Sequence, residues 1–393
     1  MRKWTVAIVV QRYGAEVNGG AEVAARWLAE QLLPTANVHV ITTCALDYTT
    51  WADYYEAGES ELNGVHVHRF SVDAARRWRQ SQKRTGQLLQ REHSLFDEVT
   101  WVKEQGPFSN ALFDFIRRRA PHFDIFFFFS YHYATTYFGL PLVSEKAILV
   151  PTAHDDPYLC LPVFRPLFHL PQALVYLTEP EKRLVQQVTH NAGKANIIAG
   201  VGIDVPQRTA PQRFREKYGV DVPFLLYVGR IHESKNVPEL LAYFSRFAER
   251  RPDPLKLVLI GKSHLALPDH PDIIHLGFLP EQDKFDALAA ASVVIVPSLY
   301  ESLSIITLES WRLGVPVLVN GRCDVLKHQC RQSNAGLYYT SYDEFAAATT
   351  LLLDSAGLLR RLGKNGQAFV KTHYDSRVVA AKYRTLLADV LTK

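Results

Sequence analysis

Short apolar runs recur along the first half of the chain, and each is too brief to form the buried face of a helix. They lie at Val6–Val10, Val38–Ile41, Ile125–Phe129, Ala147–Val150 and Ala173–Leu177. Runs of this length, rich in valine, isoleucine and phenylalanine, predict strands that are buried on both faces. Because segments with a helical period separate several of them, the pattern indicates a parallel α/β sheet.

The second half of the chain repeats the same alternation. Strands are predicted at Phe224–Val228, Leu257–Ile260, Ile273–His275, Val293–Val296 and Val315–Val319, and helices at about Pro238–Arg250, Glu281–Ala291 and Ser304–Leu313. Each half therefore predicts a doubly wound, Rossmann-like α/β domain, in which ligands bind at the carboxyl ends of the strands. We expect the site in the cleft between the two halves.

The alternation pauses between Gly200 and Pro223, where glycine, proline and charged residues accumulate. Such a composition is typical of a linker between domains. Near the end of the chain, the segment Asp375–Leu391 spaces its apolar residues like one face of a helix. A chain of 393 residues is also too long for one hydrophobic core, so two globular domains are expected.

Composition narrows the class of partner. A hydrophobic content of 47% excludes a disordered chain, and a formal net charge of +4 suits anionic ligands or a membrane surface without requiring nucleic acid. The cysteines, at positions 44, 160, 323 and 330, include no CxxC pair. The sequence therefore indicates neither a disulfide framework nor a zinc site, and it favours a reducing compartment.

The apolar segments are too short for membrane insertion. The run before Gln11 is shorter than the hydrophobic region of a signal peptide, and stretches such as Ile125–Phe129 fall far below the roughly 20 residues that a membrane span requires. We expect a soluble, cytoplasmic protein.

A loop with two adjacent glycines follows the first predicted strand. Asn18, Gly19 and Gly20 lead into an amphipathic helix that begins near Ala21. Glycine lets the backbone approach a ligand, and a helix N-terminus offers N–H groups to an anion, so a phosphate is a candidate ligand. The alternative is that the two glycines only form the turn, since no GxGxxG pattern is present.

Two cations follow the first strand of the second half, in the segment YVGRIHESKN. Arg230 and Lys235 lie five residues apart with a glycine before them. An arginine fork and a lysine point charge at the end of a strand are suited to a diphosphate. The alternative is a pair of solvated loop charges.

A histidine with two carboxylates follows the strand that ends at Val150. His154 at a strand end is a candidate to contact a substrate oxygen, and Asp155 and Asp156 are candidates to fix its tautomer. The alternative is a histidine satisfied within its loop. Neighbouring aspartates rarely face the same ion, so no metal site is predicted.

The run ESLSIITLE places two glutamates in an otherwise small and apolar segment. The strand Val293–Val296 and the helix predicted from about Ser304 put Glu301 in the intervening loop and Glu309 on the helix. A carboxylate among apolar residues must find donors or shift its pKa, so both are candidates to bind hydroxyl groups. The alternative makes Glu301 a capping charge and Glu309 a surface residue.

Together these segments resemble the family 4 glycosyltransferases, which are retaining nucleotide-sugar enzymes of the GT-B fold. The matching segments occur in the family's order: NGGAE, GVGID, YVGRIHESKN, LVLIGK, IIHLGFLPEQD and VVIVPSLYESLSIITLESWRLGVPVLV, the last with its E-x7-E signature. The resemblance implies two Rossmann-like domains that face a central cleft. The acceptor-side domain would span residues 1–205, the nucleotide-sugar-binding domain 206–374, and a C-terminal helix at 375–393 would pack back on the first domain.

The resemblance also implies roles for the candidate residues. Arg230 and Lys235 would hold the donor diphosphate, Glu301 would bind hydroxyls of the donor sugar, and His154 would lie beside the transferring sugar. Further donor contacts would come from Gly19, Gly20, Gly277, Phe278, Ser304, Ile305, Ile306 and Glu309. Among these, Glu309 would bind the ribose, and the backbone around Gly277 and Phe278 would receive the nucleobase.

The chain departs from the family pattern at two places. Family members often have glycine where Ser304 stands, so the resemblance does not indicate which donor sugar is used. The segment between Tyr48 and Gln105 matches no family motif and contains the basic cluster Arg76–Arg84 with Trp78 inside it. Such a cluster suits a polyprenyl diphosphate or peripheral contact with the inner face of the cell membrane. The alternative is a solvated helix face.

The activity implied is transfer of a glycosyl group from a nucleotide diphosphate sugar to a hydroxyl of a saccharide or lipid-linked saccharide, with retention at the anomeric carbon. It would serve bacterial-type cell-surface polysaccharide or glycolipid assembly and would need no cofactor and no metal. Two alternatives remain open at this point: a nucleotide-sugar hydrolase or epimerase, and an inactive nucleotide-sugar-binding subunit.

Overall fold

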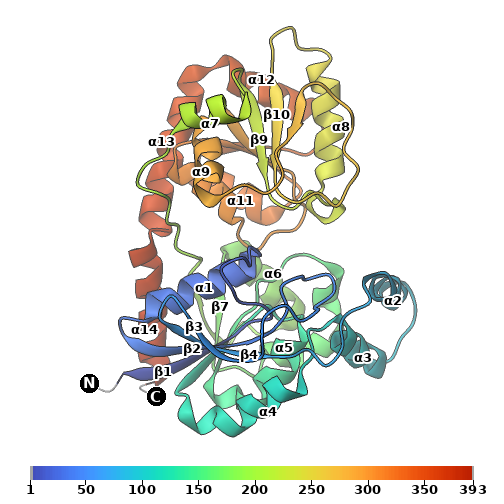
Figure 1. Cartoon of the computed structure of the whole chain (residues 1–393), viewed down its shortest axis with the longest axis vertical. Coiled ribbons are helices and arrows are strands. Elements are labelled where there is room, and N and C mark those ends of the chain that lie inside the picture. Colours follow the sequence, from blue (N-terminus) through green and yellow to red (C-terminus); the bar gives the residue numbers. More distant parts are fainter. Residues whose placement is uncertain (1–2, 392–393) are drawn as a thin grey trace. The chain divides into compact units, whose positions relative to one another are not determined.

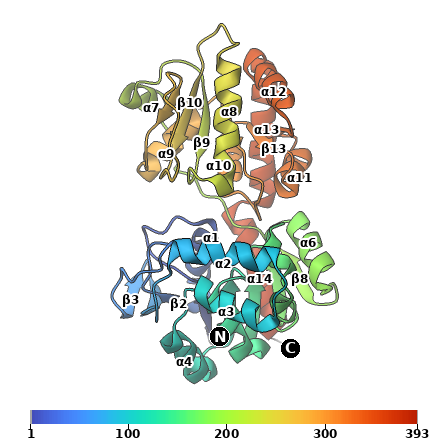
Figure 2. The same ribbon diagram turned by 90° about the vertical axis from the view of Figure 1, so that its right-hand side faces the viewer.

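The computed structural model describes residues 3–391 and divides the chain into two compact units. The first unit runs to Val201 and also includes the residues from Val379 onward, and the second is Gly202–Val378. Each unit is a mostly parallel sheet with helices on its faces (Figures 1 and 2). The predicted division at residue 205 differs from this one by only a few positions.

The sheet of the first unit has the strand order β3-β4-β2-β1-β5-β6-β7-β8 within residues 3–391. All neighbouring pairs are parallel except β3 with β4. The strands are β1 (Trp4–Val9), β2 (Ala36–Thr43), β3 (Gly58–Leu62), β4 (Val65–Phe70), β5 (Ile125–Phe129), β6 (Ala147–Val150), β7 (Ala173–Tyr176) and β8 (Ala195–Ile198). Every residue of β5, IFFFF, is buried, as expected for a central strand covered on both faces.

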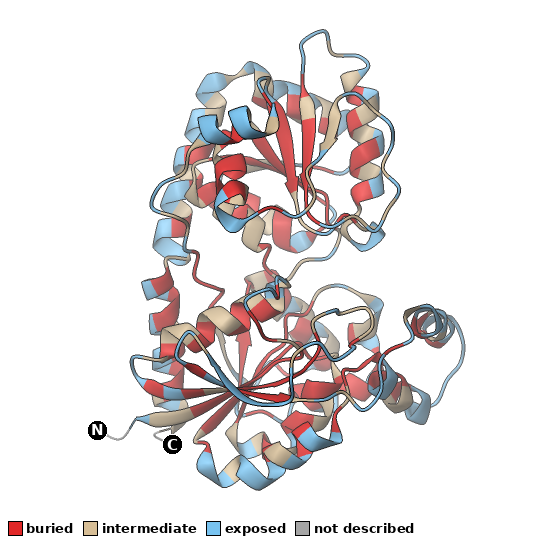
Figure 3. Ribbon diagram, viewed as in Figure 1, coloured by how far each residue is buried: buried red, intermediate tan, exposed pale blue. Residues whose placement is uncertain are grey.

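Helices and short 3-10 turns connect these strands. The helices are α1 (Gly20–Leu32), α2 (Trp78–Gln90), α3 (Leu95–Gln105), α4 (Asn110–Arg119), α5 (Ala134–Gly139) and α6 (Glu179–Thr189). The 3-10 turns are η1 (Ala120–His122), η2 (Leu140–Lys146), η3 (Pro157–Cys160), η4 (Pro162–Phe164) and η5 (Pro166–Phe168). Figure 3 shows the strands as mostly buried and the outer helix faces, including much of α2, as exposed.

The last helix, α14 (Ser376–Leu391), joins the first unit through its apolar face. The ring of Tyr383 is buried and lies 6.0 Å from Trp27 of α1 and 6.1 Å from Phe127 of β5. This is the helix that the spacing of Asp375–Leu391 predicted.

The sheet of the second unit has the order β11-β10-β9-β12-β13-β14, and its pairs are all parallel within the described residues. Its strands are β9 (Phe224–Val228), β10 (Lys256–Ile260), β11 (Ile273–His275), β12 (Val293–Val296), β13 (Val317–Asn320) and β14 (Gly336–Tyr339). Its helices are α7 (Pro211–Tyr218), η6 (Glu233–Lys235), α8 (Val237–Ala248), α9 (Glu281–Ala290), α10 (Ile305–Arg312), α11 (Asp324–Ser333), α12 (Tyr342–Asp354) and α13 (Ala356–His373).

Strand order reverses once in each sheet, between β1 and β5 in the first unit and between β9 and β12 in the second. At such a switch point the loops leave in opposite directions, which opens a crevice beyond the carboxyl ends of the strands. A ligand site is therefore expected at the loops that follow these strands.

The predicted linker at Gly200–Pro223 is wrong in part, because α7 lies inside it. Pro211 begins this helix and Gly219, in the left-handed conformation (φ 66°), ends it. Lys217 pairs with Asp283 of α9 at 2.6 Å, and the Nε of Arg213 donates to Asp286 at 2.7 Å. The charges that indicated a solvated linker instead attach a helix to the second unit.

The predicted basic surface at Arg76–Arg84 also needs correction. Arg76 is buried, donates to the carbonyl of Thr49 at 3.0 Å and to the side-chain oxygen of Gln105 at 3.0 Å, and stacks against the rings of Trp51 and Trp78. Its guanidinium therefore makes contacts inside the protein and does not face a partner. None of the helices within residues 3–391 has both the length and the hydropathy of a membrane span.

Candidate functional site

The loops on either side of the second unit's switch point carry Lys235 and Glu301. Lys235 ends η6, in the loop after β9, and Glu301 lies in the loop after β12. Nζ of Lys235 is 2.6 Å from Oε1 of Glu301, and the two side chains are 27% and 15% exposed. A half-buried pair of this kind remains reachable by a ligand while being less screened than a surface pair.

Arg230 lies in the same loop as Lys235 and is exposed. Its carbonyl accepts a 2.6 Å hydrogen bond from the Tyr227 hydroxyl, which fixes the backbone from which the guanidinium extends. Just before it, Gly229 lies so close to Gly261 that a Cβ on Gly261 would be 2.0 Å from the Gly229 carbonyl oxygen. Only glycine fits there, and the loops after β9 and β10 meet backbone to backbone.

The loop after β11 joins this arrangement through Gly277. Its carbonyl accepts a 2.8 Å hydrogen bond from the N–H of Gly261, and its φ of 69° is a conformation that favours glycine. The next residue, Phe278, is 70% exposed. A ring left so accessible at a strand end offers a flat apolar face to a planar ligand.

The start of α10 lies beyond β12 and has Ser304 as its N-cap. Ser304 is buried and takes the left-handed conformation (φ 67°), and its side chain makes no capping hydrogen bond. Its Oγ instead lies 2.9 Å from Oγ1 of Thr307. The N–H groups at Ile305 and Ile306 thus open a helix without a side-chain cap, a polarity that favours an anion.

Glu309 on α10 also has a lysine partner. Nζ of Lys284, on α9, lies 2.9 and 3.1 Å from the two carboxylate oxygens. Burial raises the pKa of Glu309, and the Lys284 charge opposes that rise. Sequence reasoning did not select Lys284, because a contact between two helices leaves no spacing pattern in the chain.

In the first unit, Gly19 and Gly20 stand at the start of α1 with different freedom. A Cβ on Gly19 would lie 2.1 Å from the Oε2 of Glu22, whereas a Cβ on Gly20 would meet nothing within 4 Å. Glu22 is buried in the first turn and accepts a 2.8 Å hydrogen bond from Arg12. An anion at this helix start would meet that carboxylate too, with Arg12 offsetting its charge.

His154 follows β6 and is partly exposed, with Nδ1 3.8 Å from Asp156. That distance is too long for a hydrogen bond, so Asp156 does not fix the tautomer by a direct contact. Asp156 instead caps η3 by accepting from the N–H groups of Tyr158 and Leu159, and burial raises its pKa. Asp155 is exposed. The expectation that Asp156 fixes the tautomer of His154 is therefore wrong.

What holds the His154 loop in place is a set of residues that the sequence did not reveal. Buried Glu181 accepts from the N–H of Ala153 at 2.7 Å and from that of Leu177 at 2.6 Å, and burial raises its pKa to about 8. Ser130 and Thr152, at the ends of β5 and β6, both have positive φ and lie 2.8 Å apart through their hydroxyls. Threonine rarely adopts this conformation, so the strain marks a tightly determined site.

A metal site would need several ligating side chains close together in residues 3–391. No group of three or more His, Cys, Asp or Glu side chains there is arranged to hold an ion. Arg230, Lys235 and the start of α10 are sources of positive charge at the second unit's switch point.

Residues 210–369 match the family model described as "Glycosyl transferases group 1". The matched segment covers most of the second unit and includes its candidate residues from Arg230 to Glu309.

Curated relatives match over a similar share of the chain. An uncharacterized glycosyltransferase of Methanocaldococcus jannaschii is 26% identical over 41% of this chain and 44% of its own length. D-inositol 3-phosphate glycosyltransferase 2 of Catenulispora acidiphila is 27% identical over 49% of this chain and 50% of its own length. The chain thus matches about half the length of these relatives.

Solved structures match over nearly the whole chain. Sucrose-phosphate synthase from Thermosynechococcus elongatus superimposes with a TM-score of 0.73 at 16% identity, covering 99% of this chain and 100% of that one. A trehalose-6-phosphate protein from E. coli, bound with UDP-2-fluoro glucose, gives 0.68 at 13% identity over 99% of both. The predicted fold class is confirmed: the chain has the α/β GT-B fold with two Rossmann-like domains.

Proposed function

We propose, from the match of residues 210–369 to group 1 glycosyl transferases, that this chain is a retaining glycosyltransferase. It would move a sugar from a nucleoside diphosphate sugar to an acceptor hydroxyl. The observation that carries the proposal is the Lys235–Glu301 pair, which joins the two loops that flank the switch point.

Arg230, Lys235 and the start of α10 are assigned to the donor diphosphate. When the sugar departs, negative charge grows on the leaving phosphate, so cations and helix-start amides stabilise the transition state more than the ground state. This supply of positive charge comes from the chain itself, and the proposal includes no metal and no cofactor.

The two glutamates are assigned to hydroxyl groups of the donor. Glu301 would accept from the sugar, with Lys235 holding one of its oxygens. Glu309 would accept from the ribose, with Lys284 contacting both oxygens of its partly buried carboxylate and opposing the rise of its pKa. The exposed ring of Phe278 and the backbone at Gly277 would receive the nucleobase.

For the first unit the proposal keeps His154 as a contact of the transferring sugar and the backbone at Gly19 and Gly20 as contacts of the diphosphate. Its support is the place of these residues after β6 and β1, at the carboxyl edge of the sheet. Retention would follow a front-face route in which the departing phosphate accepts the proton of the acceptor, because Glu301 is already engaged by Lys235.

The acceptor is proposed to be a saccharide or lipid-linked saccharide of cell-surface polysaccharide or glycolipid assembly. A membrane contact would use the outer face of α2, where Arg79 and Lys83 are exposed, and the start of α3, where Phe96 is 78% exposed. Cosedimentation with phosphatidylglycerol vesicles, weakened by Lys83→Glu, supports this contact. Equal binding of the wild type and of Lys83→Glu to these anionic vesicles contradicts it.

A donor screen tests the proposed activity. UDP-, GDP- and ADP-sugars are added singly, and the melting temperature is recorded, since a ligand that binds the folded state raises it. The stabilising donor is then incubated with saccharide acceptors, with and without EDTA. Transfer that survives EDTA is expected. Release of free sugar as fast without acceptor as with it would instead indicate a hydrolase, and binding without any product an inactive subunit.

A further inference from the structure

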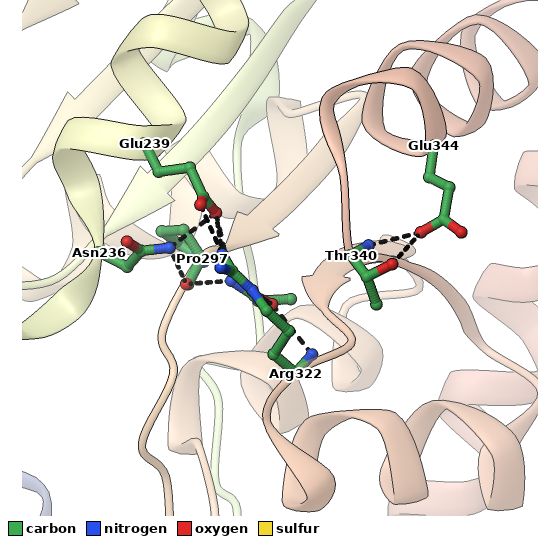
Figure 4. A network of polar contacts seen from close by, with 7 residues as sticks. Asn236, Glu239, Pro297, Arg322, Thr340 and Glu344 are labelled. Carbon is green, nitrogen blue, oxygen red and sulfur yellow. Dashed lines mark hydrogen bonds and ion pairs between the residues drawn. The ribbon is translucent and has the colours of Figure 1, made fainter.

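A polar network lies beside the Lys235–Glu301 pair in the second unit. We call it the Glu239 network, and it consists of Asn236, Glu239, Pro297, Asn320 and Arg322. Figure 4 labels all of these residues except Asn320. Oε1 of Glu239 accepts from the Asn236 side chain at 2.8 Å, and Oε2 lies 2.5 Å from Nη2 of Arg322. In Figure 4, Glu239 stands between Asn236 and Arg322 as the shared acceptor.

The carbonyl of Pro297 is the second centre of the network. It accepts from the side-chain amide of Asn236 at 3.2 Å and from that of Asn320 at 3.0 Å. Asn320 is fully buried, and its own oxygen accepts from the backbone N–H and the Nε of Arg322 at 3.0 and 3.2 Å. A buried amide whose groups are all satisfied has one preferred orientation, so the network is rigid.

The network joins the loops that carry the candidate site. Asn236 directly follows Lys235, and its left-handed backbone (φ 55°) forms the turn from η6 into α8. Pro297 is the first residue after β12 and precedes Glu301 in the same loop, while Arg322 lies in the loop after β13. Side chains from α8 and the end of β13 therefore tie the loop of Lys235 to the loop of Glu301.

We propose that Glu239 and Arg322 are positioning residues for the donor site. Lys235 and Glu301 are long, flexible side chains, and their 2.6 Å contact depends on where their two loops are held. Removing the Glu239 carboxylate leaves the Asn236 amide and the Arg322 guanidinium without this acceptor, and the loops lose their shared support. The inference rests on the proposed function, because it assigns the network to diphosphate binding through Lys235.

Glu344 provides a matched control at the same edge of the sheet (Figure 4). It too is a glutamate in the first turn of a helix, α12, and it accepts from the N–H and the hydroxyl of Thr340 at 2.6 and 2.7 Å. Both of those contacts are local to the start of its own helix. Changing Glu344 therefore removes a cap of similar chemistry without touching the loops of Lys235 and Glu301.

The test is calorimetric titration with UDP, GDP and ADP, using whichever of the three the wild-type protein binds. Glu239→Ala and Arg322→Met are expected to weaken binding roughly tenfold, in the range that coupled neighbours show. Glu239→Gln keeps the oxygen that Asn236 contacts. Its nucleotide affinity should therefore lie between that of these two variants and that of the wild type. Glu344→Gln should bind within about twofold of the wild type.

Combination with Lys235→Ala separates positioning from general stability. If Glu239 acts through Lys235, Glu239→Ala adds no further loss of nucleotide affinity in the Lys235→Ala protein, while the losses of unfolding free energy add. Wild-type affinity in both folded Glu239→Ala and Arg322→Met, or additive affinity losses, would overturn the inference and leave the proposed function standing. A wild-type protein that binds none of the three nucleotides would overturn both.

Discussion

Lys235 and Glu301 occupy the two loops at the switch point, and each side chain is the other's charged partner at 2.6 Å. Removing either one leaves a half-buried charge and takes a contact from the proposed donor. We expect Lys235→Ala and Glu301→Ala each to lower kcat/KM roughly 100-fold or more, the loss typical of a group that stabilises developing charge. Steady-state kinetics with the donor found in the screen measures this.

Lys256 and Asp272 form the matched control for that experiment. They are a lysine–carboxylate pair of similar length, 2.8 Å, in the same unit, but Lys256 begins β10 and so lies away from the carboxyl ends of the strands. Lys256→Ala should keep near wild-type kcat/KM. Folded Lys235→Ala protein with wild-type turnover would remove this residue from the site.

Ser304 combines a left-handed backbone with a hydroxyl contact to Thr307. Ser304→Ala keeps the unfavourable conformation and loses the contact, so it should cost about 1 kcal/mol of unfolding free energy. Ser304→Gly loses the same contact but removes the left-handed penalty of about 1–2 kcal/mol, so glycine should be more stable than alanine here. Urea unfolding measures the order, which is opposite to the usual helix preference.

At the residue scale, sequence reasoning selected the lysine that pairs with Glu301 but missed the lysine that pairs with Glu309. Lys235 was selected because it follows a strand and a glycine within a dense motif. Lys284 was not, because nothing along the chain indicates that α9 brings it to Glu309. The role of Asp156 was predicted wrongly for a different reason: its carboxylate accepts from the N–H groups of its own turn.

At the scale of elements, the loops after β9 and β10 approach each other closely because each has a glycine where they meet. A Cβ on Gly261 would meet the Gly229 carbonyl at 2.0 Å, and its φ of 136° is strained for any other residue. Gly261→Ala should therefore destabilise the protein by about 2–4 kcal/mol and weaken donor binding. Thermal unfolding, with and without the donor, checks both effects.

Gly357 on α13 is the control for Gly261. It is exposed, and a Cβ there would meet nothing within 4 Å. Gly357→Ala should raise the unfolding free energy by about 0.5–1 kcal/mol, because alanine is the better helix former. Equal stability of the two variants would contradict the close approach of the two loops.

The elements themselves were predicted with uneven success. The strands Phe224–Val228, Ile273–His275 and Val293–Val296 are confirmed with the predicted bounds. The first and third are buried, and buried parallel strands leave dense apolar runs. The exposed edge strand β3, GESEL, was not predicted because only its pairing with β4 makes it a strand. Helix α7 was taken for a linker because its charges are satisfied by α9, far along the chain.

At the scale of the whole molecule, a histidine cluster between β2 and β4 should make stability depend on pH. Nδ1 of His39 is 3.0 Å from Nε2 of His68, and its ring stacks on that of His66. Burial and the nearby His68, His66 and Arg119 lower the pKa of His39 from 6.5 to about 4. As the pH falls, His39 thus binds a proton near pH 6.5 in the unfolded chain but only near pH 4 in the folded protein.

The direction of the pH dependence follows from this difference in pKa between the folded and unfolded states. The contribution of His39 is complete above pH 6.5 and is lost as the pH falls toward 4, so the unfolding free energy should drop by about 1–2 kcal/mol between pH 7 and pH 5. His39→Gln should remove most of this drop, whereas the same change at the exposed His122 should not. Urea unfolding at both pH values decides; an unchanged slope in His39→Gln would contradict the assignment.

The sequence by itself determined the α/β class, the repeated doubly wound pattern and the candidate chemistry of ESLSIITLE. These follow from short-range rules: apolar run length, helix start and stop residues, and the need of a carboxylate for donors. Tertiary structure decided which partners those residues have. Lys284 at Glu309, Glu181 beneath the His154 loop and Arg76 in the interior are contacts between segments distant in the chain, fixed by strand order and packing. Residue spacing carries no record of such contacts.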